Sequence, residues 1–361
     1  MRIHDESLAN SWMGPGFRPH PLLRSSHLMS IVPGFLPRPL RRFARGGKRR
    51  IFKIDEKTSL LGYCHFREGA DSDNPTVLLL HGLEGSSESS HVLGIGYKAF
   101  MNGFNVVRLN MRNCGGSIDY AESLYHAGLY ADPLKVIETL LGERPNSKFI
   151  LCGYSLGGNL LLNSAIAAGS SQCETARGQS SGFKSENSIL AVCTVSPCID
   201  LAAAVDTIEK PENQIYQNWF LRTMKQKITE KAKQQRRSFD ISSMKSIKTI
   251  REFDDRFTAP DGGYGTAERY YFEASAKSRL KDINIPCLII ASKDDPLVPF
   301  ESFATLDISN DMIELLITSE GGHGGFFQES QEEEDHFDQF WAENRVVAYI
   351  REVSSRAKNG T

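Results

Sequence analysis

Six short apolar runs, separated by longer mixed segments, dominate the pattern of hydrophobic and polar positions along this chain. Most of their residues are apolar on both faces, a pattern typical of parallel strands that are buried on both sides. The runs cover residues 77–80, 106–109, 149–152, 189–195, 287–291 and 313–317. The pattern therefore predicts a mostly parallel sheet at the centre of the fold.

Helical patterns lie between these runs, and the clearest covers residues 132–141. Asp132 is placed to cap this helix, Pro133 suits its first position, and apolar residues follow at helical spacing. Alternation of strands and helices predicts an α/β fold, a doubly wound sheet with helices on both faces. Its chemistry belongs at the carboxyl ends of the strands.

The outer segments have weaker patterns. Residues 51–54 and 60–66 alternate loosely around a polar turn, which predicts an antiparallel hairpin at one edge of the sheet. Residues 1–50 are rich in Pro and Arg, and we expect them to wrap the outside, with one helical turn at 26–32. Residues 331–354 are amphipathic enough for a closing helix.

Two segments interrupt the alternation. Residues 169–188 are rich in Gly, Ser and Gln, which indicates a surface loop without chemistry. Residues 199–281 carry helical patterns and lie before the penultimate strand, where an insertion has the size of a cap over an active site. We therefore expect a core made of residues 51–198 and 282–361, with residues 199–281 as a helical cap or lid.

Charge gives no global attraction to an ionic partner, since 42 Lys and Arg oppose 44 Asp and Glu in 361 residues. The exception is a basic run at residues 38–50, which could touch lipid headgroups or RNA. A solvated entry segment is the favoured interpretation, because no sustained apolar face accompanies these charges. We expect no nucleic-acid partner.

Seven cysteines occur without the paired spacing of a metal site, and Cys152, Cys193 and Cys287 lie inside apolar runs as small hydrophobic residues. This usage indicates a reducing compartment. No apolar stretch of signal-peptide length follows Met1, and no run approaches the roughly 18 to 20 residues of a membrane span. We expect a cytoplasmic protein with no integral membrane anchor, as a monomer or small homo-oligomer.

The run at 149–152 continues into Gly153-Tyr-Ser-Leu-Gly157 and then a helical pattern. This order predicts a strand, a sharp turn and a helix, with Ser155 held in strained geometry as an exposed nucleophile. Gly153 and Gly157 are needed where a Cβ would strike a neighbouring element. The unpaired N–H groups at the start of the helix lie where an oxyanion would form.

A serine nucleophile needs a base and an acid. His323 lies in a glycine-rich loop after the last strand, and Asp294 and Asp295 follow the penultimate strand. We favour Asp295 as the acid because it directly precedes the turn at 296–299, which Asp294 is better placed to fasten. Asp294 stays open as the alternative.

The strand at 77–80 ends in His81-Gly82, where the chain turns sharply. This turn predicts an oxyanion hole formed by the N–H groups of Leu83 and Leu156. His81 itself is interpreted as structural, holding the loop. No cofactor and no metal site is expected.

Seven motifs together resemble the YheT-like branch of the α/β-hydrolases, which includes bacterial esterases, yeast medium-chain ester synthases and mammalian abhydrolase-domain lipases. They are His81-Gly-Leu-Glu-Gly-Ser-Ser87, Asn110-Met-Arg-Asn-Cys-Gly-Gly116, Tyr125-His-Ala-Gly128, Gly153-Tyr-Ser-Leu-Gly-Gly158, Glu252-Phe-Asp-Asp-Arg-Phe-Thr-Ala-Pro260, Asp294-Asp-Pro296 and Gly321-Gly-His-Gly-Gly-Phe326. An early Arg24-Ser-Ser-His-Leu28 also fits, so the similarity runs from about residue 17 to the end. The resemblance implies the α/β-hydrolase fold and ester chemistry, with Ser155, Asp295 and His323 as nucleophile, acid and base.

Two positions depart from the family pattern: Asn113 stands where Gly is usual, and Gly324 stands where Val is common. The favoured function is a serine esterase that cleaves short- to medium-chain acyl esters through an acyl-enzyme. The same site could serve an alcohol O-acyltransferase or a thioesterase. A non-catalytic binding protein on the same fold is the alternative from another class.

Overall fold

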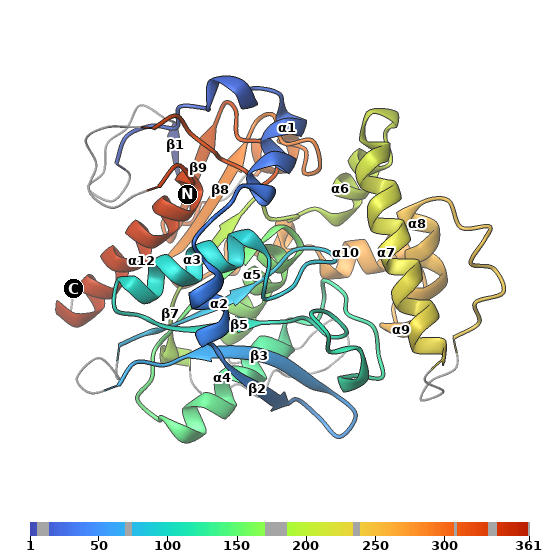
Figure 1. Cartoon of the computed structure of the whole chain (residues 1–361), viewed down its shortest axis with the longest axis horizontal. Helices are drawn as coiled ribbons and strands as arrows, with labels where there is room; N and C mark the ends of the chain where they lie inside the picture. The colour runs from blue at the N-terminus through green and yellow to red at the C-terminus, as the bar shows by residue number, and fades with distance from the viewer. Residues whose placement is uncertain are drawn as a thin grey trace.

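A nine-stranded sheet forms the centre of the computed structural model, which describes residues 1–5, 14–68, 74–169, 186–233, 239–306, 309–330 and 338–359 (Figure 1). The strand order is β1-β9-β8-β7-β6-β4-β5-β3-β2. The six strands predicted from the apolar runs are confirmed as β4 to β9, and they pair in parallel with one another. The strands are β1 Arg2–Asp5, β2 Lys48–Lys53, β3 Ser59–His65, β4 Thr76–Leu80, β5 Asn105–Leu109, β6 Phe149–Tyr154, β7 Ile189–Val195, β8 Cys287–Ser292 and β9 Ile313–Thr318.

Helices cover both faces of this sheet, as predicted. Side chains of a strand alternate between faces, so Leu78 and Leu80 of β4 pack in the cluster that contains α4 and α5 residues, while Val77 and Leu79 pack with α3 and α12. All four are buried, and each contributes about 1.5 to 3 kcal/mol. The helices of the core are α1 Ser26–Ile31, α2 Arg41–Gly46, α3 Ser90–Met101, α4 Ala131–Glu143, α5 Ser155–Ala168, α11 Glu301–Ala304 and α12 Trp341–Asn359.

The edges of the sheet hold one confirmed prediction and one correction. β2 and β3 form the predicted antiparallel hairpin at one edge. At the opposite edge, however, β1 pairs in parallel with β9, so the first residues of the chain extend the sheet instead of wrapping it. Further along, the helical turn expected at residues 26–32 is present as α1.

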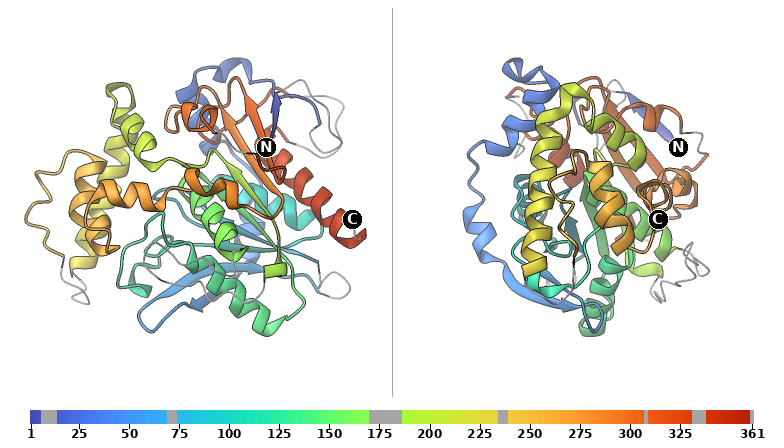
Figure 2. Two further views of the ribbon diagram at one scale, coloured as in Figure 1. Left: turned by 180° about the vertical axis from the view of Figure 1, so that it is seen from behind. Right: turned by 90° about the vertical axis from the view of Figure 1, so that its right-hand side faces the viewer.

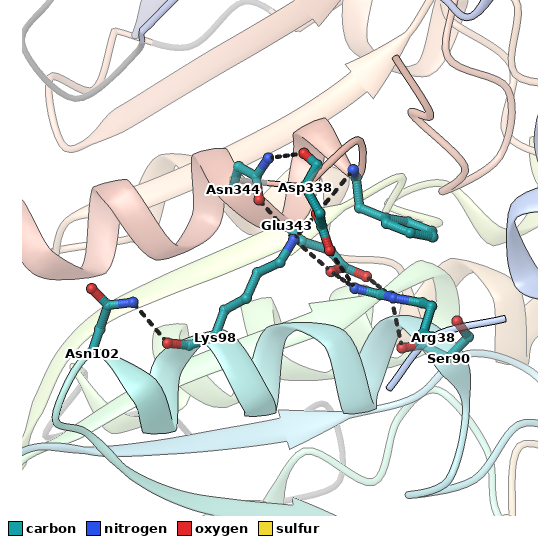
Figure 3. Close-up of polar contacts among 8 residues, drawn as sticks. Arg38, Ser90, Lys98, Asn102, Asp338, Glu343 and Asn344 are labelled. Carbon is teal, nitrogen blue, oxygen red and sulfur yellow. Dashed lines mark hydrogen bonds and ion pairs between the residues drawn. The ribbon is translucent and has the colours of Figure 1, made fainter. Parts of the chain in front are cut away.

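Arg38, the first residue of the basic run at 38–50, is bound to the core and is not solvated, whereas Arg41, Arg42, Arg45, Lys48 and Arg49 are exposed, as expected for a solvated segment. Arg38 is buried and donates two hydrogen bonds to Glu343 of α12, 2.7 Å from Nη1 to Oε1 and 2.6 Å from Nη2 to Oε2 (Figure 3). Lys98 of α3 lies 3.0 Å from the same carboxylate and also pairs with Asp338. Arg38 and Lys98 are therefore held away from solvent by carboxylates on distant elements. The number of basic residues in the sequence does not reveal such pairing.

Asp132 provides a second correction, because it does not cap α4. The residue at the cap position is Tyr130, and Asp132 lies within the first turn of the helix. Its carboxylate accepts two hydrogen bonds from Arg112, at 2.7 and 2.6 Å. A buried guanidinium needs a carboxylate partner more than a helix end needs a cap, so the ion pair determines the orientation of Asp132.

Residues 199–281 form a group of helices beside the core, at the right in Figure 1 and towards the viewer in the right panel of Figure 2. We call these residues the inserted segment. An apolar cluster that includes Leu221, Ile228 and Phe253 joins its helices to Leu124 of the core. Its helices are α6 Leu201–Ile208, α7 Gln214–Lys233, α8 Ile250–Phe253, the π-helix η7 Asp254–Thr258, α9 Ala259–Asp261 and α10 Ala267–Ala274, with 3-10 turns η6 Pro211–Asn213 and η8 Lys277–Asp282.

The loop predicted at residues 169–188 lies mostly outside the described residues, as does the start of the predicted closing helix, which appears as α12. Short 3-10 turns η1 Pro21–Leu23, η2 Val32–Phe35, η4 Ile118–Tyr120 and η5 Glu186–Ser188 connect elements of the core. In the described ranges, no helix combines the length and apolar character that crossing a bilayer requires.

Candidate active site

A sharp turn between β6 and α5 holds Ser155. β6 ends at Tyr154, α5 begins at Ser155, and the φ of Ser155 is 50°, in the left-handed region that non-glycine residues adopt at a cost of about 1 to 3 kcal/mol. A Cβ on Gly157 would lie 2.2 Å from the carbonyl oxygen of His81, and one on Gly153 would lie 2.7 Å from that of Gly157. Only glycine fits at both positions, which is the close packing that the motif predicts.

The loop after β4 lies directly against Ser155. A Cβ on Gly82 would come within 3.1 Å of the Ser155 Cβ. Leu83 of this loop and Leu156 of α5 line the same pocket as Ser155. Leu156 is the second residue of its helix, so its N–H belongs to the first turn, where amides have no intrahelical acceptor. Both residues predicted to form the oxyanion hole therefore line the pocket that Ser155 lines, and their role stays a prediction.

His81 is buried and uses both ring nitrogens within the core. Nδ1–H donates to the Gly82 carbonyl at 2.7 Å, and Nε2 accepts the Met111 N–H at 3.1 Å. Burial lowers the pKa of His81 to about 4, so the ring is neutral near pH 7. It ties the loop after β4 to the loop after β5, in line with its interpretation as a structural residue.

His323 and Asp295 form a close pair at the neighbouring strand ends. His323 Nδ1 lies 2.9 Å from Asp295 Oδ2 and 3.1 Å from Oδ1. The Asp295 side chain is only 3% exposed. Its Oδ1 also accepts the N–H groups of Leu297 at 2.8 Å and Val298 at 2.9 Å. These bonds hold the carboxylate in an orientation that faces the imidazole.

Asp294 has a different partner. Its Oδ1 accepts the Gly322 N–H at 2.9 Å, so it anchors the glycine-rich loop one residue before His323. The hydrogen bonds to the turn at 296–299 come from Asp295, so the prediction that Asp294 holds this turn is wrong. Adjacent side chains in an extended turn point in different directions, so one carboxylate serves the loop and the other serves the imidazole.

The loop of His323 lies beside the turn of Ser155. Gly324 has a φ of +74°, and a Cβ there would lie 3.3 Å from the ring of Tyr154, the residue before Ser155. A valine would be strained in this conformation, so the backbone here requires the glycine that the sequence supplies. The other departure from the family pattern, Asn113, has a φ of 61°, a conformation that asparagine tolerates better than most residues.

Ser155 opens onto a pocket between the core and the inserted segment. The side chains that line it are mainly apolar and include Leu83, Leu124, Leu201, Ala204, Val205, Ile208, Phe220, Met224, Ile228, Ile250, Phe253 and Leu297. Cys198 also lines it, with Sγ 3.4 Å from Ser155 Oγ. Burial raises the pKa of this thiol to about 12, so it is a neutral neighbour of the serine.

Phe220 and Tyr270 of the inserted segment line this pocket. Trp219 and Phe272 are instead 52% and 81% exposed, and Leu221 packs within the inserted segment. Successive residues of a helix are about 100° apart, so the orientation of α7 turns Phe220 inward and its neighbour Trp219 outward.

Two buried polar groups in the pocket wall were not predicted from the sequence. Glu84 accepts hydrogen bonds from Lys227 Nζ at 2.7 Å and from the Tyr125 hydroxyl at 2.6 Å. Asp254 of the π-helix accepts the Tyr271 hydroxyl at 2.7 Å, and burial raises its pKa to about 6. Glu84 and Asp254 both lie in the motifs quoted above, so position in a motif is the signal that could have identified them.

Comparison with known proteins places the chain in a family. Residues 75–330 match the family model described as the alpha/beta hydrolase fold. The chain is 30% identical over 278 residues to the putative esterase YheT of Escherichia coli, covering 76% of each protein. The solved structure of a 2,6-dihydroxy-pseudo-oxynicotine hydrolase has the same fold, with a TM-score of 0.52 at 17% identity, covering 86% of this chain and 67% of that one. The chain therefore belongs to the α/β-hydrolase family, in its YheT-like branch.

Other relatives are longer than this chain. It is 32% identical over 259 residues to human phospholipase ABHD3, covering 71% of this chain and 60% of that protein. It is also 29% identical over 267 residues to a monoacylglycerol lipase of Saccharomyces cerevisiae, covering 72% of this chain and 56% of the yeast protein. The chain thus spans about three fifths of the length of these relatives.

Proposed function

We propose that this protein hydrolyses carboxylic esters of short- to medium-chain acyl groups, with Ser155, His323 and Asp295 as its catalytic triad. The observation that carries the proposal is the strained Ser155 at the start of α5, which opens onto an apolar pocket, while the loop that carries the paired His323 lies against the neighbouring Tyr154. The names of the relatives add support, since a phospholipase, an esterase and a monoacylglycerol lipase all act on acyl esters.

In the proposed reaction, Ser155 Oγ attacks the ester carbonyl carbon and its proton passes to Nε2 of His323. Nδ1–H of His323 remains donated to Asp295, which stabilises the imidazolium. The N–H groups of Leu83 and Leu156 receive the oxyanion, and donors of this kind contribute about 3 kcal/mol each. The imidazolium then protonates the leaving alcohol, and water attacks the acyl-enzyme by the same sequence of proton transfers.

We propose that the inserted segment is a cap that determines which acyl-chain lengths the enzyme accepts. Its apolar side chains, such as Phe220 and Met224, form one wall of the pocket. Each methylene buried there contributes about 0.8 kcal/mol, so kcat/KM should rise about fourfold per methylene until the pocket is full, and then fall. A p-nitrophenyl ester series from acetate to palmitate measures this profile, and a flat profile would contradict it.

Ser155→Ala tests the triad. Loss of a triad member costs roughly 10⁴-fold or more in turnover, while the fold and melting temperature should change little. Fluorophosphonate labelling, mapped by mass spectrometry, should modify Ser155 in the wild type and nothing in the variant. Retention of more than a few per cent of esterase activity in Ser155→Ala would refute the assignment.

Ala204→Phe tests the pocket independently of the triad. Ala204 lines the pocket from α6, and a phenyl ring there would occupy space that an acyl chain needs. We expect activity on acetate esters to persist while the preferred chain becomes shorter. An unchanged chain-length profile would show that the acyl group binds elsewhere.

A further inference from the structure

The helix α1 packs directly against the loop that carries His323. A Cβ on Gly322 would lie 2.7 Å from both the Ser26 carbonyl oxygen and the Ser30 Oγ, and one on Gly325 would lie 1.8 Å from the Met29 carbonyl oxygen. The two backbones therefore approach as closely as glycine permits. This helix comes from the first tenth of the chain, almost 300 residues before the loop it contacts.

One side chain of α1 bonds to His323 itself. Ser30 Oγ donates to the Ser26 carbonyl at 2.6 Å and accepts the His323 N–H at 2.7 Å. Because the hydroxyl proton points to Ser26, a lone pair faces His323. A serine that bonds back along its own helix is common and explains the first bond. It does not explain the second, which joins the helix to the proposed base.

Two other anchors of the loop act on the residue before His323. Asp294 accepts the Gly322 N–H, and Ser292 Oγ donates to the Gly322 carbonyl at 2.9 Å. Asp295 holds the imidazole through Nδ1. Ser30 is thus the group that holds the backbone N–H of His323, between a fixed Gly322 and a fixed ring nitrogen.

The inserted segment also rests on α1 at this point. The Tyr216 hydroxyl of α7 lies 3.2 Å from His27 Nδ1, and the two rings stack with centroids 5.7 Å apart. Burial raises the pKa of Tyr216, and both Ser30 and Asp295 are close enough to perturb it. The first turn of α7 therefore packs against α1 at His27, three residues before Ser30.

We propose that Ser30 is a positioning residue for the reaction: its hydroxyl holds the His323 backbone so that Nε2 stays aligned with Ser155. This inference rests on the triad proposed above. A displacement of about 1 Å at a catalytic group costs on the order of 100-fold in rate, and such a loss falls on turnover rather than on substrate binding.

The test compares Ser30→Ala with Ser25→Ala, a matched control at the start of the same helix whose exposed side chain makes no capping hydrogen bond. With p-nitrophenyl butyrate, kcat of Ser30→Ala should fall about 10- to 100-fold with KM within about twofold of wild type. Ser30→Thr retains the acceptor and should restore most of kcat. Ser25→Ala should match wild type in both constants.

A kcat within about threefold of wild type in Ser30→Ala would overturn the inference, as would a loss that falls on KM or that Ser25→Ala shares. If Ser30→Ala does not fold, Ser30→Cys decides by the same criteria, because the thiol is somewhat larger than the hydroxyl, leaves no cavity and accepts a hydrogen bond only weakly. Wild-type esterase activity that depends on Ser155 must be present first. If it is present and Ser30→Ala is unaffected, the positioning role fails while the triad stands.

Discussion

Glu343→Gln should destabilise the fold far more than a matched change elsewhere on α12. The Glu343 side chain is 3% exposed and pairs with Arg38, at 7%, and with Lys98, at 9% (Figure 3). Glutamine keeps the shape but removes the charge, so two buried cations keep only the partly exposed carboxylate of Asp338. Removing one partner of a buried ion pair costs about 3 to 5 kcal/mol.

Because Asp338 compensates part of the charge, we expect a loss near the lower limit, about 3 kcal/mol. Unfolding entropy of about 2.1 cal/mol/K per residue gives roughly 0.8 kcal/mol/K for this chain, so the melting temperature should fall by about 4 °C. Differential scanning calorimetry and urea titration measure the two quantities independently.

Glu352→Gln is the matched control, since it makes the same chemical change on the same helix. Glu352 and Arg356 lie 3.1 Å apart, but their side chains are 32% and 60% exposed. A surface pair of this kind contributes less than about 0.5 kcal/mol to the free energy of unfolding and is screened by salt. The loss of stability in Glu343→Gln should instead persist in about 0.5 M NaCl. Equal shifts in the two variants would refute the reasoning that burial gives the Glu343 cluster its energetic importance.

Three further changes test the site. Gly157→Ala should abolish activity and lower stability, because its Cβ would lie 2.2 Å from the His81 carbonyl oxygen; a folded, active variant would contradict the packing of the turn. Asp294→Asn should lower the melting temperature by loosening Gly322 and reduce kcat less than Asp295→Asn, and the reverse order in a kinetic comparison would exchange their roles. Asp254, with a pKa raised to about 6, binds its proton more tightly in the folded state, so the free energy of unfolding falls as pH rises from about 4 to 6. Asp254→Asn should remove this fall and be more stable than the wild type by up to about 3 kcal/mol above about pH 6. If the melting temperatures of the two proteins changed in parallel between about pH 4 and 8, this reasoning would be refuted.

Strands β4 to β9 and the turn at Ser155 could be predicted from the amino-acid sequence alone. The apolar runs of β4 to β9 are readable because burial on both faces imposes a local composition on each strand. The turn at Ser155 is readable for a similar reason, since Gly153 and Gly157 answer steric demands made within a few residues. Order along the chain then places His323 and the Asp294-Asp295 pair at neighbouring strand ends.

Which side chains come into contact depends on how the helices and strands pack together. Asp295 rather than Asp294 contacts His323 because the turn after β8 sets their directions, and Phe220 rather than Trp219 enters the pocket because α7 is rotated as a unit. The contact of Ser30 with His323 joins residues 293 positions apart. Local composition carries no record of such distant contacts, because hydrogen bonds and ion pairs depend on side-chain directions that are set when the elements pack together.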